Sequence, residues 1–182
     1  MTTAISATDR YDRTTIGFHW LTAALVLVLF GSSLLWNYAP RSWGLRWLEG
    51  THVSLGIALA AVLVARLIWR LVAGRKLETA VGGVAALASR AVHGLLYVLL
   101  AAQVALGFGL RWLQGETFSF FGLFSIPSLF DSNRELAHQF EQLHNLTAWA
   151  MIYLVAGHAA AALIHRYLLR DGVLQRMLPM AG

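Results

Sequence analysis

Histidine is the residue type in this sequence whose chemistry and placement are most informative. Seven histidines lie at positions 19, 52, 93, 138, 144, 158 and 165, most of them inside or beside long apolar stretches. Imidazole nitrogens bind transition metals, and an ionisable group within a membrane is costly enough that it usually marks function. The chain has no cysteine, which excludes disulfides, thiolate metal sites and cysteine-ligated iron–sulfur clusters. Any redox chemistry therefore needs a bound cofactor.

The spacing of His144 and His158 predicts one ligand in each half of a membrane. They are fourteen residues apart, which on an α-helix returns to within about 40° of the same face and separates them by about 21 Å along the axis. Matching the depths of the other apolar stretches pairs His19 with His158 at one end and His52 with His144 at the other. The arithmetic predicts two bis-histidine sites, one above the other.

Paired histidines suit haem iron better than a bare metal ion. Zinc and copper sites usually gather three or four ligands at one point, whereas this chain supplies pairs at two depths and no carboxylate within an apolar stretch. Haem iron already has four porphyrin nitrogens and needs only axial ligands from the protein. Arg66 and Arg70 are candidate partners for the inner haem propionates. A small transporter without haem is disfavoured, because acids and broken helices are absent from the apolar stretches.

Periodicity alone leaves the ligand set open. His93 lies at the inner end of its apolar stretch, and His165 follows His158 by seven residues on nearly the same face. Either of them is an alternative to His19 or His158 as an inner ligand. In the same way, His138 competes with His144 at the outer end.

The elements that position these histidines are four apolar stretches, each long enough to cross about 30 Å of hydrocarbon as a helix. They run from about 16 to 36, 52 to 73, 91 to 113 and 144 to 169. The composition agrees, with 58% hydrophobic and only 13% charged residues. Because lipid offers the backbone no hydrogen-bond partners, we expect an all-α, integral membrane four-helix bundle that forms a single domain over residues 1–182. The first stretch lacks a small-residue cleavage site and is expected to be retained.

The basic residues predict the orientation of the bundle, since cytoplasmic loops carry the excess of Lys and Arg. Ten lie at one end: Arg10, Arg13, Arg66, Arg70, Arg75, Lys76, Arg90, Arg166, Arg170 and Arg176. Four lie at the other: Arg41, Arg46, Arg111 and Arg134. We therefore expect both termini to be cytoplasmic. The net charge of +5 is then explained by contact with anionic lipid, without nucleic acid.

Two segments at the outer end are harder to interpret. The stretch from Pro40 to Glu49 places Trp and Leu between arginines and is expected to lie in the interface as a short amphipathic segment. The loop from Gln114 to Leu143 joins an apolar piece, 118–126, to a polar, helix-like piece, 132–142. This loop is expected to cap the outer end of the bundle.

Several of these residues lie in motifs that resemble the bacterial cytochrome b561 family over nearly the whole chain. The motifs are Gly17-Phe18-His19-Trp20-Leu21, His52-Val53-Ser54-Leu55-Gly56 followed by Arg66, and Gly157-His158 with four alanines, then His165 and Tyr167. One departure is Leu143, where the family often has Trp before the histidine that opens the last span.

The resemblance implies two b-type haems with axial ligands His19, His52, His144 and His158, in a multi-pass protein of the bacterial cytoplasmic (inner) membrane. Several members are similar to superoxide oxidases, so the implied activity is electron transfer from superoxide to ubiquinone, with His165 as a quinone-site residue. Arg41, Arg46 and Arg111 near the outer mouth would then attract the superoxide anion. The alternative is a haem-bearing anchor that carries electrons between a soluble redox partner and the quinone pool.

Overall fold

The computed structural model describes residues 10–38, 40, 47–78 and 81–179 of the chain. Four long helices dominate it: α1 (Arg13–Tyr38), α2 (Trp47–Val72), α3 (Gly83–Leu113) and α4 (Arg134–Ile164). Each is long and apolar enough to cross a membrane. The expected all-α membrane four-helix bundle is therefore confirmed, with each helix extending several residues beyond at least one end of its apolar stretch.

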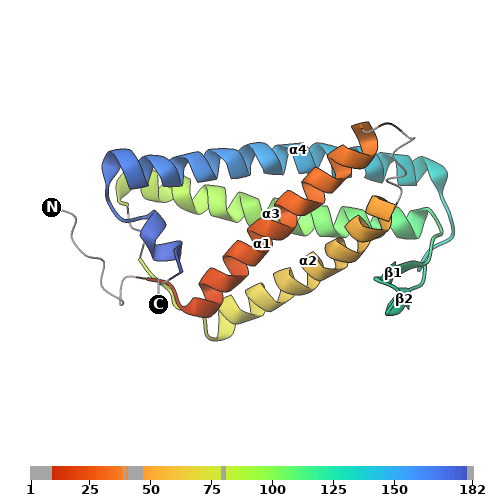
Figure 1. Ribbon diagram of the computed structural model, residues 1–182, viewed down its shortest axis with the longest axis horizontal. Helices are drawn as coiled ribbons and strands as arrows, with labels where there is room; N and C mark the ends of the chain where they lie inside the picture. The colour runs from red at the N-terminus through yellow and green to blue at the C-terminus, as the bar shows by residue number, and fades with distance from the viewer. Residues whose placement is uncertain (1–9, 39, 41–46, 79–80, 180–182) are drawn as a thin grey trace.

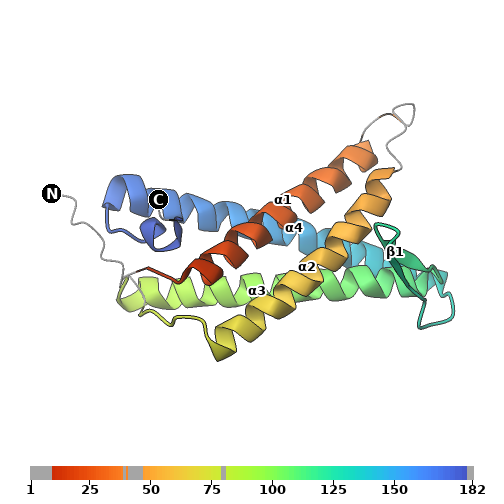
Figure 2. The same cartoon turned by 60° about the horizontal axis from the view of Figure 1, so that its bottom comes forward.

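The four helices pack as two antiparallel pairs (Figures 1 and 2). Helix α3 lies along α4, and α1 lies along α2, whereas α2 and α3 touch at fewer points. The first and last described segments meet at one end of the bundle, where the backbone N–H of Tyr11 donates to the carbonyl of Arg176 at 3.2 Å. We call this the His19 end and the opposite end the His52 end.

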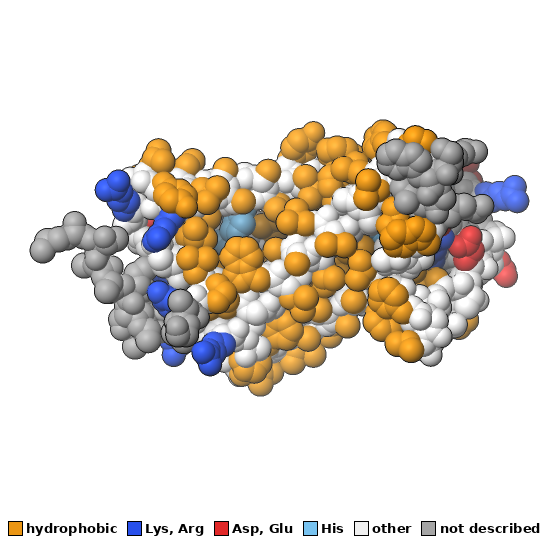
Figure 3. Space-filling model, in the orientation of Figure 1, with side chains coloured by type: hydrophobic (Ala, Val, Ile, Leu, Met, Phe, Trp, Pro, Cys, Tyr) orange, Lys and Arg blue, Asp and Glu red, His pale blue; other side chains and the backbone are white. Residues whose placement is uncertain are grey.

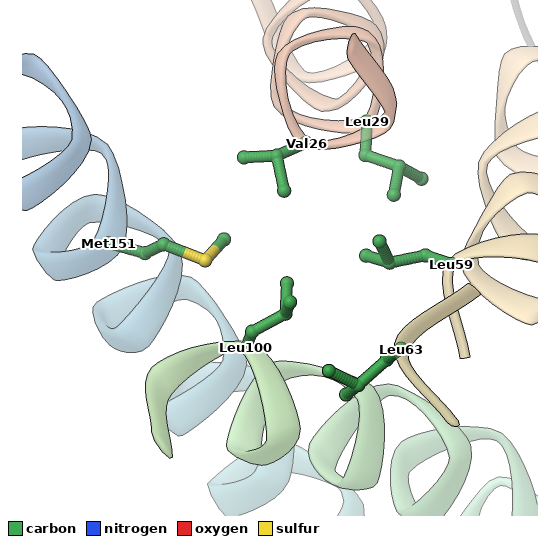
Figure 4. Packing of buried hydrophobic residues seen from close by; sticks show 6 residues of the cluster. All are labelled: Val26, Leu29, Leu59, Leu63, Leu100 and Met151. Atoms are coloured by element: carbon green, nitrogen blue, oxygen red, sulfur yellow. The ribbon is translucent and has the colours of Figure 1, made fainter. Parts of the chain in front are cut away.

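The core is a single apolar layer at the middle of the bundle. Figure 4 shows its six buried side chains, which come from all four helices: Val26, Leu29, Leu59, Leu63, Leu100 and Met151. Met151 is seven residues from both His144 and His158, so this layer lies midway between the two histidines along α4, about 10 Å from each. The outer surface of the helices is also apolar, as lipid contact requires (Figure 3).

Charge is unequal between the two ends. On the face in Figure 3, Lys and Arg side chains gather mainly at the His19 end, on the left, and most of the visible Asp and Glu side chains lie at the other end. This is the asymmetry on which the predicted orientation depends.

The loop at the His52 end differs from the prediction. The polar piece 132–142 is not a separate cap: α4 begins at Arg134 and continues without a break into the span. Asn133 starts the helix, because its side-chain oxygen accepts a hydrogen bond from the Leu136 N–H at 3.0 Å. The apolar piece 118–126 forms a hairpin of β1 (Phe118–Phe120) and β2 (Phe124–Ile126). Most of the predicted interfacial segment, 41–46, lies outside the described residues.

Asp12 joins the first two helices at the His19 end. Its carboxylate accepts hydrogen bonds from the Thr15 N–H and hydroxyl, from the Trp69 indole of α2 and from the Arg75 backbone N–H. Partial burial by itself raises the pKa of Asp12, but these hydrogen bonds together lower it from 3.8 to about 2. Asp12 therefore caps α1 and fixes it against the end of α2.

Replacing Asp12 by Ala is expected to lower the melting temperature of the purified protein at pH 6 by about 2–4 °C, the effect of losing one helix cap. Since the folded pKa is depressed, the contribution of the carboxylate is complete above about pH 5 and is lost as the pH falls through about 2. The difference between the variant and the wild type should shrink over that window in thermal melts at stepped pH. A difference that does not change with pH, or an equal effect from Asp131→Ala in the exposed loop, would contradict this role.

Candidate functional site

At the His52 end, α2 and α4 bring His52 and His144 together. Their ring centroids are 6.4 Å apart with the planes inclined by 71°. The pair bridges the two helix pairs, since α2 belongs to one and α4 to the other. The predicted outer partners therefore face each other across the bundle.

At the His19 end, α1 and α4 place His19 opposite His158 in the same way. The ring centroids are again 6.4 Å apart, with the planes inclined by 67°. The Trp20 ring lies edge-on to His19 at 5.4 Å and its indole N–H donates to the carbonyl of Met177 at 2.8 Å. This contact ties the His19 turn of α1 to the C-terminal segment.

Both spacings match what an iron atom between two imidazoles requires. A metal–nitrogen bond of about 2.0–2.1 Å on each side, plus about 1.1 Å from each nitrogen to its ring centre, places the two centroids about 6.2–6.4 Å apart. Direct contact between two imidazole rings would not by itself require a centroid separation of 6.4 Å at both ends of the bundle. Within the described parts of the chain, no group of three or more His, Asp or Glu side chains is arranged to hold a bare metal ion. The residues therefore fit bis-histidine haem.

Hydrogen bonds orient the ring of His52 for ligation through Nε2. Its Nδ1 lies 3.1 Å from the carbonyl oxygen of Leu29 and 3.2 Å from the hydroxyl of Ser32. A carbonyl only accepts, so Nδ1 carries the proton and donates, which leaves Nε2 unprotonated. Metal-binding histidines are usually held by such a bond from the nitrogen that does not bind the metal. Trp36 packs edge-on against the same ring at 4.9 Å.

The ring of His144 is held differently, by close approach of α3. A Cβ added at Gly107 would lie 3.2 Å from Cε1 of His144 and 3.7 Å from its Nδ1. The Nδ1 atom is buried, and the polar group that interacts with this ring is the backbone carbonyl of Gln103, one turn before Gly107 on α3. Gly107 was not found by sequence reasoning, because a glycine on an apolar helix is usually a packing residue.

Replacing Gly107 by Val is expected to remove most of the haem at the His52 end. The added methyl groups would collide with the His144 ring, because Cε1 of that ring lies only 3.2 Å from the position of a Cβ at residue 107. The measurement is haem per chain by the pyridine haemochrome method, with Gly50→Ala as the control, since a Cβ at Gly50 meets no atom within 4 Å. Full haem content in Gly107→Val would show that the contact does not position the ligand.

His93 also lies at the His19 end, but its geometry differs. Its ring centroid is 5.1 Å from that of His158, which is shorter than the separation that an intervening iron requires. Its Nδ1 lies 2.6 Å from the carbonyl oxygen of Ser89, one turn earlier in α3. This spacing favours His19 over His93 as the partner of His158.

The other two alternative ligands lie away from the paired rings. His138 is exposed on the first turns of α4, where it contacts Gln142 and Glu141. His165 begins the π-helical turn η3 (His165–Leu169), and its Nδ1 contacts the carboxylate of Asp171. Partial burial by itself raises the pKa of Asp171, but the hydrogen bonds from His165 and from the Val173 N–H, together with the charge interaction with His165, lower that pKa. π-Helical turns are frequent at functional sites.

Arg66 and Arg70 differ in their surroundings. Arg66 is fourteen residues after His52 on α2, the same offset that separates His144 from His158, so it reaches the depth of the His19 end. It is half-buried, and its guanidinium carbon lies over the Tyr97 ring at 5.0 Å. Arg70 is exposed on the last turn of α2. Arg66 is therefore the better placed of the two to pair with a propionate.

Arg111 is not free to attract an anion. It donates to Glu49 and to Glu116, both at 2.7 Å, and its side chain is only 16% exposed. Two carboxylates balance its charge locally, which argues against Arg111 as a residue that attracts superoxide. Instead it fastens the start of α2 to the end of α3. The other two arginines of that prediction, Arg41 and Arg46, lie outside the described residues.

Comparison with known proteins agrees with this geometry. The family model described as prokaryotic cytochrome b561 matches residues 10–180. The chain is 31% identical to "Probable superoxide oxidase CybB" of Yersinia pestis over 176 residues, covering 93% of this chain and 96% of that protein. It is 32% identical to "Cytochrome b561 homolog 2" of Escherichia coli (strain K12) over 174 residues, covering 93% and 92%. It is 29% identical to "Cytochrome b562" of Cereibacter sphaeroides over 184 residues, covering 92% and 94%.

The match covers all four apolar helices and both histidine pairs. Together with the helices, it shows a multi-pass protein of the bacterial inner membrane that carries haem b and transfers electrons. Over almost its whole length, the chain belongs to the prokaryotic cytochrome b561 family.

Proposed function

We propose that this protein is a two-haem superoxide:ubiquinone oxidoreductase, with His52 and His144 holding one haem and His19 and His158 the other. The observation that carries the proposal is the repeated 6.4 Å spacing of two histidine pairs, at two positions on α4 that are fourteen residues apart. Haem iron, when bound, supplies the one-electron chemistry that no side chain of this chain provides. The relative named as a superoxide oxidase supports the choice of donor.

The proposed reaction balances without a further reactant. Two superoxide anions each give up one electron and leave as dioxygen, and one ubiquinone takes two electrons and two protons to become ubiquinol. The orientation with both termini cytoplasmic, which the charge asymmetry supports, places superoxide oxidation at the periplasmic, His52 end. Quinone reduction then takes place at the His19 end, where protons come from the cytoplasm.

The chain's own residues divide the work between the two ends. The Leu29 carbonyl and Ser32 fix the ring of His52, and Gly107 lets α3 support the ring of His144. The apolar layer that includes Leu59 excludes water between the ends, so protons do not follow electrons across the bundle.

His165 is the residue best placed to meet a quinone carbonyl. The bond to Asp171 engages Nδ1 and leaves Nε2 for a ligand. The same segment also carries Arg166, Tyr167 and Arg170, which with Gln175 line a recess of about 280 Å³ that does not include His165 itself. The carboxylate of Asp171 behind the imidazole fixes the orientation of the ring, from which Nε2 can exchange a proton with a bound quinone.

Replacing His165 by Ala is expected to lower the rate of quinone reduction by about 100-fold or more, the usual scale for a lost proton donor, while both haems stay bound. Ubiquinone reduction by the pre-reduced protein, followed by stopped-flow spectroscopy, measures this directly. Asp171→Asn should fall between the wild type and His165→Ala, because the imidazole remains but loses its carboxylate. If the rate depends on His93 and is indifferent to His165, the quinone site lies elsewhere at this end.

A superoxide source tests the proposed function itself. Purified holoprotein, ubiquinone and a steady enzymatic flux of superoxide should yield ubiquinol, and added superoxide dismutase should abolish that yield. Ubiquinol that forms only when a stoichiometric soluble redox protein is supplied would support the membrane-anchor alternative and overturn the superoxide reaction.

A further inference from the structure

The hairpin of β1 and β2 is fastened into the bundle at the His52 end, not suspended above it. Ser54 of α2 is only 2% exposed, and its hydroxyl donates to the carbonyl of Ser119 at 3.2 Å and accepts from the N–H of Phe121 at 3.0 Å. On the other side, the buried Phe118 packs edge-on against Phe108 of α3 with the ring centroids 5.6 Å apart. The hairpin therefore bridges α2 and α3, the two neighbouring helices that touch each other little (Figure 2).

Its attachment points lie below the ends of both helices. Ser54 is seven residues after Trp47, where α2 begins, and Phe108 is five residues before Leu113, where α3 ends. At 1.5 Å per residue, these offsets correspond to about 10 Å and 8 Å along the two helices. The hairpin thus folds back along the bundle toward its middle instead of projecting away from it.

The face that the hairpin turns away from the bundle is apolar. Residues 117–130 contain no charged side chain. Phe121, Leu123 and Phe124 are 54%, 78% and 51% exposed, and Phe124 stacks on Phe120 at 5.3 Å. A tight turn at Phe121 and Gly122, both with positive φ, presents this face. The turn is closed by a hydrogen bond from the Leu123 N–H to the Phe120 carbonyl at 2.8 Å. Exposure of these apolar Phe and Leu side chains to water is unfavourable.

We propose that this face is embedded in the lipid leaflet at the His52 end, at the boundary between headgroups and acyl chains. The apolar surface is continuous in depth with the lipid-facing spans, and aromatic side chains favour that boundary. A two-stranded hairpin leaves edge N–H and C=O groups unpaired, which excludes it from the centre of the hydrocarbon. The hairpin then covers the gap between α2 and α3 beside the His52 site, and lipid covers the outer face of the hairpin. This inference depends on the membrane location and not on the electron donor.

Cysteine accessibility tests it, because the chain has no cysteine of its own. Leu123→Cys is compared with Asp131→Cys, at the charged base of the loop, and with Leu27→Cys, an exposed side chain near the middle of α1. Each holoprotein is placed in lipid nanodiscs that contain one protein molecule and treated with a membrane-impermeant, charged maleimide. The rate is followed by intact mass. Phe124→Cys provides a second position on the same face.

The thiol at position 123 is expected to react at least about tenfold more slowly than that at 131, and position 27 more slowly still, because thiolate forms poorly outside water. Since Leu123 is mostly uncovered by protein, slow labelling must come from lipid. Labelling at 123 and 124 as fast as at 131 would overturn the proposal and leave the face available to a soluble protein. An unchanged haem spectrum in each variant confirms that the bundle is intact.

Discussion

Replacing His158 by Ala is expected to halve the haem content, from two haems per chain to about one. The ring of His158 faces His19 at 6.4 Å, and haem held by one axial imidazole in a site shaped for two loses both affinity and its low-spin state. His19→Ala should have the same effect, since we propose that the two rings bind the same iron. Haem quantification and the reduced spectrum of each purified variant provide the measurement.

His93→Ala is the matched control at the same end. Its ring is nearer to His158 than that of His19, at 5.1 Å, yet too near for an iron atom to lie between them. Two haems per chain in His93→Ala, with one in His19→Ala, is the expected pattern. The opposite pattern would assign the ligand to α3 and show that the helices rearrange around the cofactor.

Replacing His144 by Ala is expected to remove the other haem and leave the one at the His19 end unchanged. The central apolar layer separates the two sites, so the loss should stay local. His52→Ala should match it in haem content. Low-temperature reduced spectra distinguish which of the two haems remains in each variant.

His138→Ala controls for the alternative at this end. That side chain is exposed and contacts only its own helix in the described structure, through Gln142 and Glu141. We expect the variant to keep both haems. Loss of one haem on replacing His138, with none lost on replacing His144, would contradict the assignment.

The sequence was sufficient to predict the bundle, and it limited the residues that face one another to a few histidines at each end. Apolar length identified four helices, because the bilayer imposes both a minimum length and a helical backbone. The offset of fourteen residues then predicted that His144 and His158 lie at two depths in the membrane. In the structure, His52 faces His144 and His19 faces His158. Depth alone did not separate His19 from His93, since both lie at the same end, and a ring distance was needed.

The parts that sequence reasoning missed depend on contacts between distant segments. The sequence indicated a helix-like piece at 132–142 and an apolar span from about 144, but it did not show that the two form one helix from Arg134 onward. The hairpin has no Asn-Gly sequence to indicate its turn. The turn at Phe121 and Gly122 is instead stabilised by a hydrogen bond from the Phe121 N–H to Ser54 of α2. Gly107 acquires its role only when α3 packs against His144. Local patterns do not contain these contacts.

The visible spectrum of the purified protein, oxidised and then reduced with dithionite, tests the central claim most directly when haem is counted per chain. Two facing imidazole pairs predict two haems of the b type per polypeptide, both low-spin, with sharp bands on reduction. A preparation expressed with ample haem that contains none, or that binds a single high-spin haem, would contradict the account.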